Sequence, residues 1–207
     1  RTVRRLLKGV DSPSLQIGLL SAAVAVLSAF VKNVASVESD QGCSATSNQT
    51  STPLFSGDII CGTKGRDVIT PGSPGDLAAT EGGDIILTGR GNDVIDGAGG
   101  NDWIFGGKGK DKLTGGEGID HFAFNVALKA KNADKIMDFK AGEDRIILDS
   151  ANFKKLATGV LSADNFAINK AKDKDDFIVY SKKKDALFYD SNGSGKGGMK
   201  VFAKLKG

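Results

Sequence analysis

The sequence is poor in the residues on which most catalytic and transition-metal sites depend. It contains one histidine and two cysteines among 207 residues. No H-E-x-x-H zinc motif, C-x-x-C pair or G-x-S-x-G nucleophile elbow occurs in it. The only histidine, His121, lies inside a repeated motif, and a lone histidine on a strand face usually has a structural role. We therefore expect that the chain is not an enzyme, and that the catalytic domain of any parent protease or lipase lies outside these residues.

Glycine, in contrast, is abundant and concentrated. Of 28 glycines, 18 lie between Gly57 and Gly118. Net charge is uneven too: +2 for residues 1–53, −5 for 54–124 and +6 for 125–207, within a total of +3. The acidic middle fits a cation-binding block. The lysines of the last third alternate with aspartates, which indicates a solvated face and no nucleic-acid partner.

Aspartate recurs in this middle block with a fixed period. The spacings between successive copies are 9, 9, 8, 9, 9, 9 and 9 residues. A glycine lies within two residues before each aspartate, and an apolar residue follows two positions after it. A flexible Gly/Asp-rich linker is the alternative, but a linker has no reason to keep an apolar residue at one phase. The eight aspartates are Asp58, Asp67, Asp76, Asp84, Asp93, Asp102, Asp111 and Asp120.

The clearest copies begin at Gly97, Gly106 and Gly115, and they read GAGGNDWIF, GGKGKDKLT and GGEGIDHFA. This pattern resembles the RTX (haemolysin-type) calcium-binding repeat G-G-x-G-x-D-x-U-x, in which U is apolar. The resemblance implies an all-β protein built on a right-handed parallel β-roll. Six residues of each repeat would form a turn and three a short strand with its middle side chain inward. Two repeats, eighteen residues, would close one coil.

The resemblance also implies where calcium would bind. Aspartates on one edge would lie about 4.8 Å apart, and a dication between turns would remove their repulsion. Each ion would be held by turns two repeats apart, with carbonyls at the first, third and fifth turn positions. Oxygen ligands without histidine or cysteine favour several Ca²⁺ ions over zinc, copper or magnesium. The predicted ligands are Asp67, Asp84, Asp93, Asp102, Asp111, Asp120, Thr88, Arg90, Asn92, Gly97, Gly99, Asn101, Gly106, Lys108 and Lys110.

The first three repeats fit the pattern less well. The Asp76 copy contains Pro71 and Pro74 and has alanine at its inward position. The Asp58 copy lacks most of its turn. Coils formed by these copies are expected to bind ions weakly or not at all.

Residues 1–53 are expected to form an N-terminal apolar segment and linker, helical or poorly ordered. Basic residues precede an apolar run over residues 15–31, which resembles a secretory signal or a short membrane-active helix. A buried helix is the alternative, and the run is too rich in small residues for a clear membrane span. Residues 42–52 read as a linker. Cys43 and Cys61 would form one disulfide in an exported protein, or stay as free thiols.

Residues 125–207 are expected to form a β-rich cap, because a solenoid otherwise ends in an open strand edge. Residues 134–148 alternate apolar and polar residues around Gly142, a strand–turn–strand pattern. Further strands are expected at 176–180, 186–190 and 199–203. This order resembles the region after the repeats in type I secreted serralysin-type proteins. Relatives usually continue with an export tail, so we expect that this tail is missing or short here.

These observations predict a secreted, extracellular calcium-binding protein or domain that folds on calcium after export by the type I secretion machinery. One alternative is a membrane-active cytolysin fragment that makes membrane contact through residues 15–31. The other is the appended secretion domain of a larger hydrolase.

Overall fold

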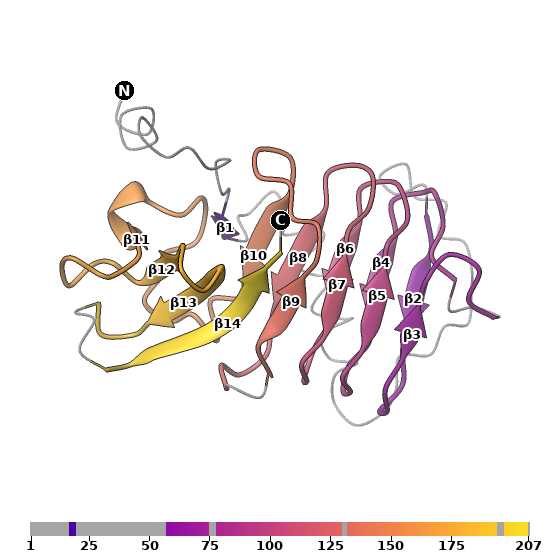
Figure 1. The fold of residues 1–207 in the computed structure, drawn as a ribbon, viewed down its shortest axis with the longest axis horizontal. Coiled ribbons are helices and arrows are strands. Elements are labelled where there is room, and N and C mark those ends of the chain that lie inside the picture. The colour runs from indigo at the N-terminus through magenta and orange to yellow at the C-terminus, as the bar shows by residue number, and fades with distance from the viewer. Residues whose placement is uncertain (1–16, 20–56, 75–77, 130–131, 194–196, 207) are drawn as a thin grey trace.

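The chain folds into two stacked β-sheets joined by turns, as the computed structural model shows (Figure 1). The structure describes residues 17–19, 57–74, 78–129, 132–193 and 197–206. Sheet A contains, in spatial order, β1 (Ile17–Leu19), β10 (Arg145–Leu148), β8 (His121–Phe124), β6 (Trp103–Phe105), β4 (Ile85–Leu87) and β2 (Ile59–Cys61). Sheet B contains β11 (Phe166–Ile168), β12 (Ile178–Ser181), β13 (Ala186–Asp190), β14 (Met199–Leu205), β9 (Asp134–Ile136), β7 (Lys112–Thr114), β5 (Val94–Asp96) and β3 (Val68–Ile69).

The repeats alternate between the two sheets, so that each strand pairs with the strand two repeats later. Ile86 of β4 lies beside Ile104 of β6, and Ile95 of β5 lies beside Leu113 of β7, in parallel register. In the repeat strands β2 to β8, the apolar residue two positions after the aspartate points into the space between the sheets and is at most 1% exposed. This one inward apolar side chain per strand forms the core of the roll. The parallel β-roll predicted from the nine-residue period is confirmed.

Asp76 lies outside the described residues, but the strands before it pair directly with the strands after it, and here the eight-repeat prediction is wrong. β2 pairs directly with β4, Ile60 beside Ile86, and β3 pairs with β5, Ile69 beside Ile95. Each of these steps spans 26 residues instead of the expected eighteen. The described residues between β3 and β4, 70–74 and 78–84, therefore add no strand to either sheet. Pro71 and Pro74 explain this locally, because proline has no N–H to donate to a strand ladder.

The coil pattern continues beyond Phe124. β9 joins sheet B in parallel with β7, and β10 joins sheet A in parallel with β8. The strand–turn–strand predicted over residues 134–148 is present, but its strands lie in different sheets and do not form a hairpin. They add one further coil to the roll.

The C-terminal strands close the end of sheet B. β12, β13 and β14 form an antiparallel meander, and β14 also pairs in parallel with β9 (Figure 1). Phe202 of β14 packs edge to face against Phe124 and against Phe153, with ring centroids 5.1 and 5.2 Å away. The cap thus covers the last coil with paired strands and aromatic side chains.

Replacing Phe202 by alanine should lower the free energy of unfolding by about 3–5 kcal/mol, because it removes a fully buried aromatic ring that touches two others. Denaturant unfolding at saturating calcium would measure the loss. Phe188 lies on the same strand pair but is only half-buried, so Phe188→Ala is the matched control. A similar loss in both variants would contradict the assigned role of the cap core.

The N-terminal predictions fall mainly outside the described residues. Of the expected helix over 15–31, only Ile17–Leu19 is described, and these residues form strand β1 beside β10. The linker at 42–52 lies wholly outside. No helix within the described ranges is long and apolar enough to cross a membrane. Cys61 is disulfide-bonded. The only other cysteine in the sequence is Cys43, which lies outside the described residues.

Candidate metal centre

The aspartates of successive coils stack on one another through their own backbones. The N–H of Asp84 donates to Oδ1 of Asp102 at 2.7 Å, and the N–H of Asp102 donates to Oδ1 of Asp120 at 3.0 Å. On the other edge, the N–H of Asp93 donates to Oδ1 of Asp111 at 2.8 Å. All five side chains are at most 1% exposed. The structure therefore brings together the three pairs that the sequence predicted to lie two repeats apart.

In three of these carboxylates the second oxygen has no hydrogen-bond donor. Oδ2 of Asp93, Asp102 and Asp111 is buried, and it has no partner among the residues that the structure describes. An unpaired oxygen of a buried carboxylate is costly, so it needs either a proton or a cation.

The first glycine of a turn makes room for these oxygens. A Cβ placed at Gly97 would overlap Oδ2 of Asp102 and would lie 2.7 Å from the carbonyl oxygen of Gly115. A Cβ at Gly106 would lie 2.7 Å from Oδ2 of Asp111. Oδ2 of Asp102 and the carbonyl oxygen of Gly115, which belongs to the next coil, thus converge beside Gly97. A side chain at position 97 would fill the space where they meet.

Carboxylate and carbonyl oxygens at such a point are the ligands that calcium prefers. Within the described ranges, no group of three or more His, Cys, Asp or Glu side chains is placed to hold a metal ion. An ion bound at these turns would therefore depend on backbone carbonyls to complete its shell. The donor set fits calcium and offers nothing that would favour zinc or copper.

Asp67 and Asp84, also predicted as ligands, have different surroundings. Thr63 donates its N–H and its hydroxyl to the carboxylate of Asp67, at 2.7 and 2.8 Å. Thr80 does the same to Asp84, at 2.8 and 2.9 Å. Both oxygens of each carboxylate are already hydrogen bonded, so these two turns are closed by threonine.

The remaining predicted ligands lie in turns that stack on one another. Oδ1 of Asn92 accepts a hydrogen bond from the N–H of Lys110 at 2.9 Å, and Oδ1 of Asn101 accepts one from Ile119 at 2.7 Å. Arg90 and Lys108 face each other in a parallel bridge, as do Gly99 and Glu117. The hydroxyl of Thr88 donates to the carbonyl of Gly106 at 3.0 Å. Thr88 occupies the first position of its turn, and this position is glycine in the neighbouring turns of the same edge.

Two aspartates that the sequence reading missed extend the ladder into the last coil. The N–H of Asp111 donates to Oδ1 of Asp134 at 3.0 Å, and the N–H of Asp120 donates to Oδ1 of Asp144 at 3.1 Å. Both are buried, 3% and 2% exposed. Their spacings of 23 and 24 residues break the period, which hid them. The signal was present, because isoleucine follows each at the inward phase, as Ile136 and Ile146.

Burial raises the pKa of these carboxyls, and neighbouring aspartates raise it further. Desolvation brings the pKa of Asp102 to about 8, with Asp120 and Asp84 adding repulsion. Burial likewise brings the pKa of Asp120 to about 6. The pKa values of Asp111 and Asp134 are both raised, mainly by burial and also by the proximity of other carboxyls. Without a cation, folding therefore raises the affinity of these four carboxyls for protons.

This shift predicts a pH dependence for the protein freed of divalent cations. The folded carboxyls hold protons more tightly than those of the unfolded chain, whose pKa is about 3.9. Their contribution to stability is therefore complete below about pH 4 and is lost as pH rises through the folded values, about 6 for Asp120 and about 8 for Asp102. We expect the β signal of the metal-free protein in circular dichroism to decrease as the pH is raised from about 4 to about 8. A signal that stays constant or grows as pH rises would contradict the assignment.

A model of a known protein family agrees with this geometry. Residues 78–113 and 89–122 match the family model of the RTX calcium-binding nonapeptide repeat, in four copies. Among solved structures, the chain is similar to the R3 subunit of the mannuronan C5-epimerase AlgE6 from Azotobacter vinelandii, with 28% identity and a TM-score of 0.42, covering 70% of this chain and 72% of that chain. No match to a curated protein was found. Residues 78–122 of this chain are therefore calcium-binding RTX nonapeptide repeats.

Proposed function

We propose that this chain is a secreted calcium-responsive module, in which the turns that end at Asp93, Asp102, Asp111 and Asp120 hold the ions. The ligands would be the carboxylates of Asp93, Asp102, Asp111 and Asp120, with carbonyl oxygens such as that of Gly115. The single observation that carries this proposal is the unpaired Oδ2 of Asp93, Asp102 and Asp111. The threonine-closed turns of Asp67 and Asp84 would remain free of metal.

The same ladder argues for folding that depends on calcium. Bound calcium supplies positive charge between stacked carboxylates that otherwise repel one another. Because the ligands come from successive coils, the site exists only in the folded chain, and ion binding stabilises that fold by linkage. Asp134 and Asp144 continue the ladder, so the coil of β9 and β10 would respond with the repeats.

Limited proteolysis with trypsin tests this proposal. Trypsin cuts after lysine and arginine, and Arg90, Lys108 and Lys110 all lie in exposed turns of the roll. We expect cleavage at these sites in chelator and strong protection in calcium, with magnesium as the control ion. Equal cleavage in chelator and calcium would contradict calcium-dependent folding.

Export by a type I channel is the second part of the proposal. A chain that stays unfolded at low cytosolic calcium can be threaded, and it would fold outside where calcium is about 0.1–1 mM or higher. Co-expression with a type I exporter would test this, with release into the medium as the readout. Retention of the chain in cells whose exporter is functional would contradict this part.

We propose no catalytic role for these residues. His121 stacks on Trp103 with ring centroids 4.4 Å apart, and burial lowers its pKa, so it is a neutral packing residue of sheet A. The membrane-active alternative depends on residues 15–31 and stays a prediction. Dye leakage from vesicles that is lost on deleting residues 1–50 would support it. Attachment to a larger hydrolase would appear as a longer reading frame upstream.

A further inference from the structure

The two edges of the roll carry opposite charge. One edge consists of the turns that lead into sheet B, at residues 62–67, 88–93, 106–111 and 125–133. We call it the basic edge, because every exposed charged side chain described there is a cation. Its aspartates are buried, and residues 130–131 lie outside the described part. The exposed cations are Lys64, Arg66, Arg90, Lys108, Lys110 and Lys129.

The opposite edge consists of the turns that lead into sheet A. Among its described residues, which leave out 75–77, the exposed charged side chains are those of Glu81, Glu117, Glu143 and one cation, Lys140. Both edges bury the same kind of aspartate ladder. If the cations served only to balance buried aspartates, the two edges would resemble each other. The concentration of cations on one edge therefore needs another explanation.

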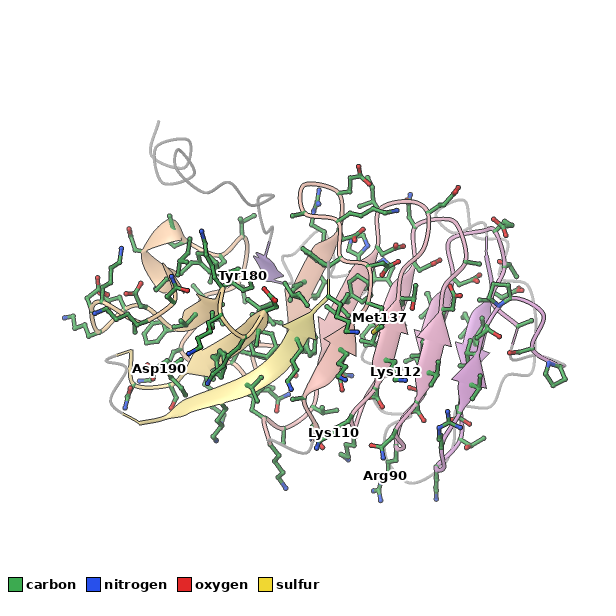
Figure 2. The ribbon with its side chains drawn as sticks, viewed as in Figure 1. Arg90, Lys110, Lys112, Met137, Tyr180 and Asp190 are labelled. Carbon is green, nitrogen blue, oxygen red and sulfur yellow. The ribbon has the colours of Figure 1, made fainter. Side chains whose placement is uncertain are left out.

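The turns of the basic edge are held in fixed register. Arg90 and Lys108 face each other in a parallel bridge, and Oδ1 of Asn92 accepts the N–H of Lys110. Neighbouring turns belong to neighbouring strands and so lie about 4.8 Å apart. Four turns place cations along a straight ridge of roughly 14 Å, estimated from that strand spacing. Figure 2 shows Arg90 and Lys110 on the lower edge of the roll, at the start of strands β5 and β7.

We propose that the basic edge binds a linear anionic polysaccharide, a chain with regularly spaced carboxylate or sulfate groups. A straight row of cations one turn apart can pair with successive anionic groups of an extended polymer. Arginine and lysine are the side chains that pair with such groups. The inference rests on the proposed function, because the register of the turns depends on the folded roll.

The composition of the edge favours this partner over two other polyanions. Proteins that bind single-stranded nucleic acid stack bases on aromatic side chains, and the four turns contain no aromatic residue. Surfaces that bind anionic membranes combine cations with large apolar side chains. In the described residues of the three repeat turns, 62–67, 88–93 and 106–111, no large apolar side chain occurs. What remains over these three turns is a polar, cationic ridge.

The test measures binding of an octameric oligogalacturonate to the full-length protein by calorimetry, in calcium and low salt. The short oligomer avoids the gels that long polyuronates form with calcium. The variant R90Q/K108Q/K110Q neutralises the centre of the basic edge. The matched control, K172Q/K182Q/K183Q, removes the same charge from exposed positions in the cap. Circular dichroism of each protein in calcium reports separately whether the roll has folded.

We expect the edge variant to bind roughly tenfold or more weakly than the control variant, since each exposed ion pair adds a small factor. Binding should also weaken as salt rises. Equal binding by both variants, equal binding of a neutral dextran, or tighter binding of an oligodeoxynucleotide of the same charge would overturn the inference. If the roll folds in calcium without binding the oligomer, only this inference fails. If calcium causes no folding, the proposed function itself fails.

Discussion

Replacing Gly118 by alanine is expected to lower the free energy of unfolding of the calcium-loaded protein by about 2–5 kcal/mol, the sum of a backbone and a packing cost. Gly118 has a φ of +119°, a conformation that side chains disfavour. A Cβ at this position would also overlap the carbonyl oxygen of Gly100 in the turn above. That oxygen belongs to the stacked backbone, so it cannot move without separating two coils.

Gly72 is the matched control. Its φ is +82°, but a Cβ there would meet nothing within 4 Å, and no described turn stacks against it. Gly72→Ala should therefore cost only the backbone term, about 1–2 kcal/mol. Denaturant unfolding at saturating calcium would compare the two. Equal losses in both variants would show that the close stacking of turns is not what requires glycine at position 118.

Replacing Asp102 by asparagine is expected to lower calcium affinity without lowering metal-free stability. Asparagine keeps an oxygen for the N–H of Asp84 but removes the charge that a cation needs. Disturbing even an outer partner of a metal site costs about 10–100-fold in affinity, and a direct ligand should cost at least as much. Without metal, however, the carboxyl of Asp102 has a pKa of about 8 because of burial, so a neutral side chain should not destabilise the fold at neutral pH.

Asp84→Asn provides the contrast. Both oxygens of Asp84 accept hydrogen bonds from Thr80, so an amide NH₂ would face donors and the fold would weaken without metal. Its effect on calcium affinity should be small. Terbium luminescence would measure ion binding beside Asp102, because Trp103 is the only tryptophan and is adjacent in sequence. The account fails if Asp84→Asn reduces terbium binding as much as Asp102→Asn does.

The sequence was sufficient to predict the coil, because the period of the aspartates and the phase of the apolar residues are both local signals. The same signals could not show that the strands before the Asp76 copy pair directly with those after it. That outcome depends on which strands pair, and a step of 26 residues competes with a step of eighteen. Asp134 and Asp144 were missed because their spacing from the aspartates of the previous coil is 23 and 24 residues instead of eighteen. Each is still followed by an inward isoleucine two positions later.

The distinction between the turns proposed to bind metal and the threonine-closed turns required the structure. Thr63, Thr80 and Thr88 each stand in a turn, at a position where the repeat pattern has glycine. The sequence alone does not distinguish the three. Only the hydrogen bonds show that Thr63 and Thr80 donate to their own aspartates, whereas Thr88 donates to the next coil. The charge of the two edges could have been predicted from the sequence, because alternate turns of the repeat lie on the same edge of the roll.

Far-UV circular dichroism of the full-length protein during a calcium titration tests the central claim most directly. The titration would run from chelator to about 10 mM, above the ~0.1–1 mM affinities of extracellular calcium modules. Magnesium at the same concentrations is the control. A cooperative gain of β signal with calcium alone is the predicted result. A spectrum that does not change with calcium, whether folded or unfolded throughout, would contradict calcium-dependent folding of the roll.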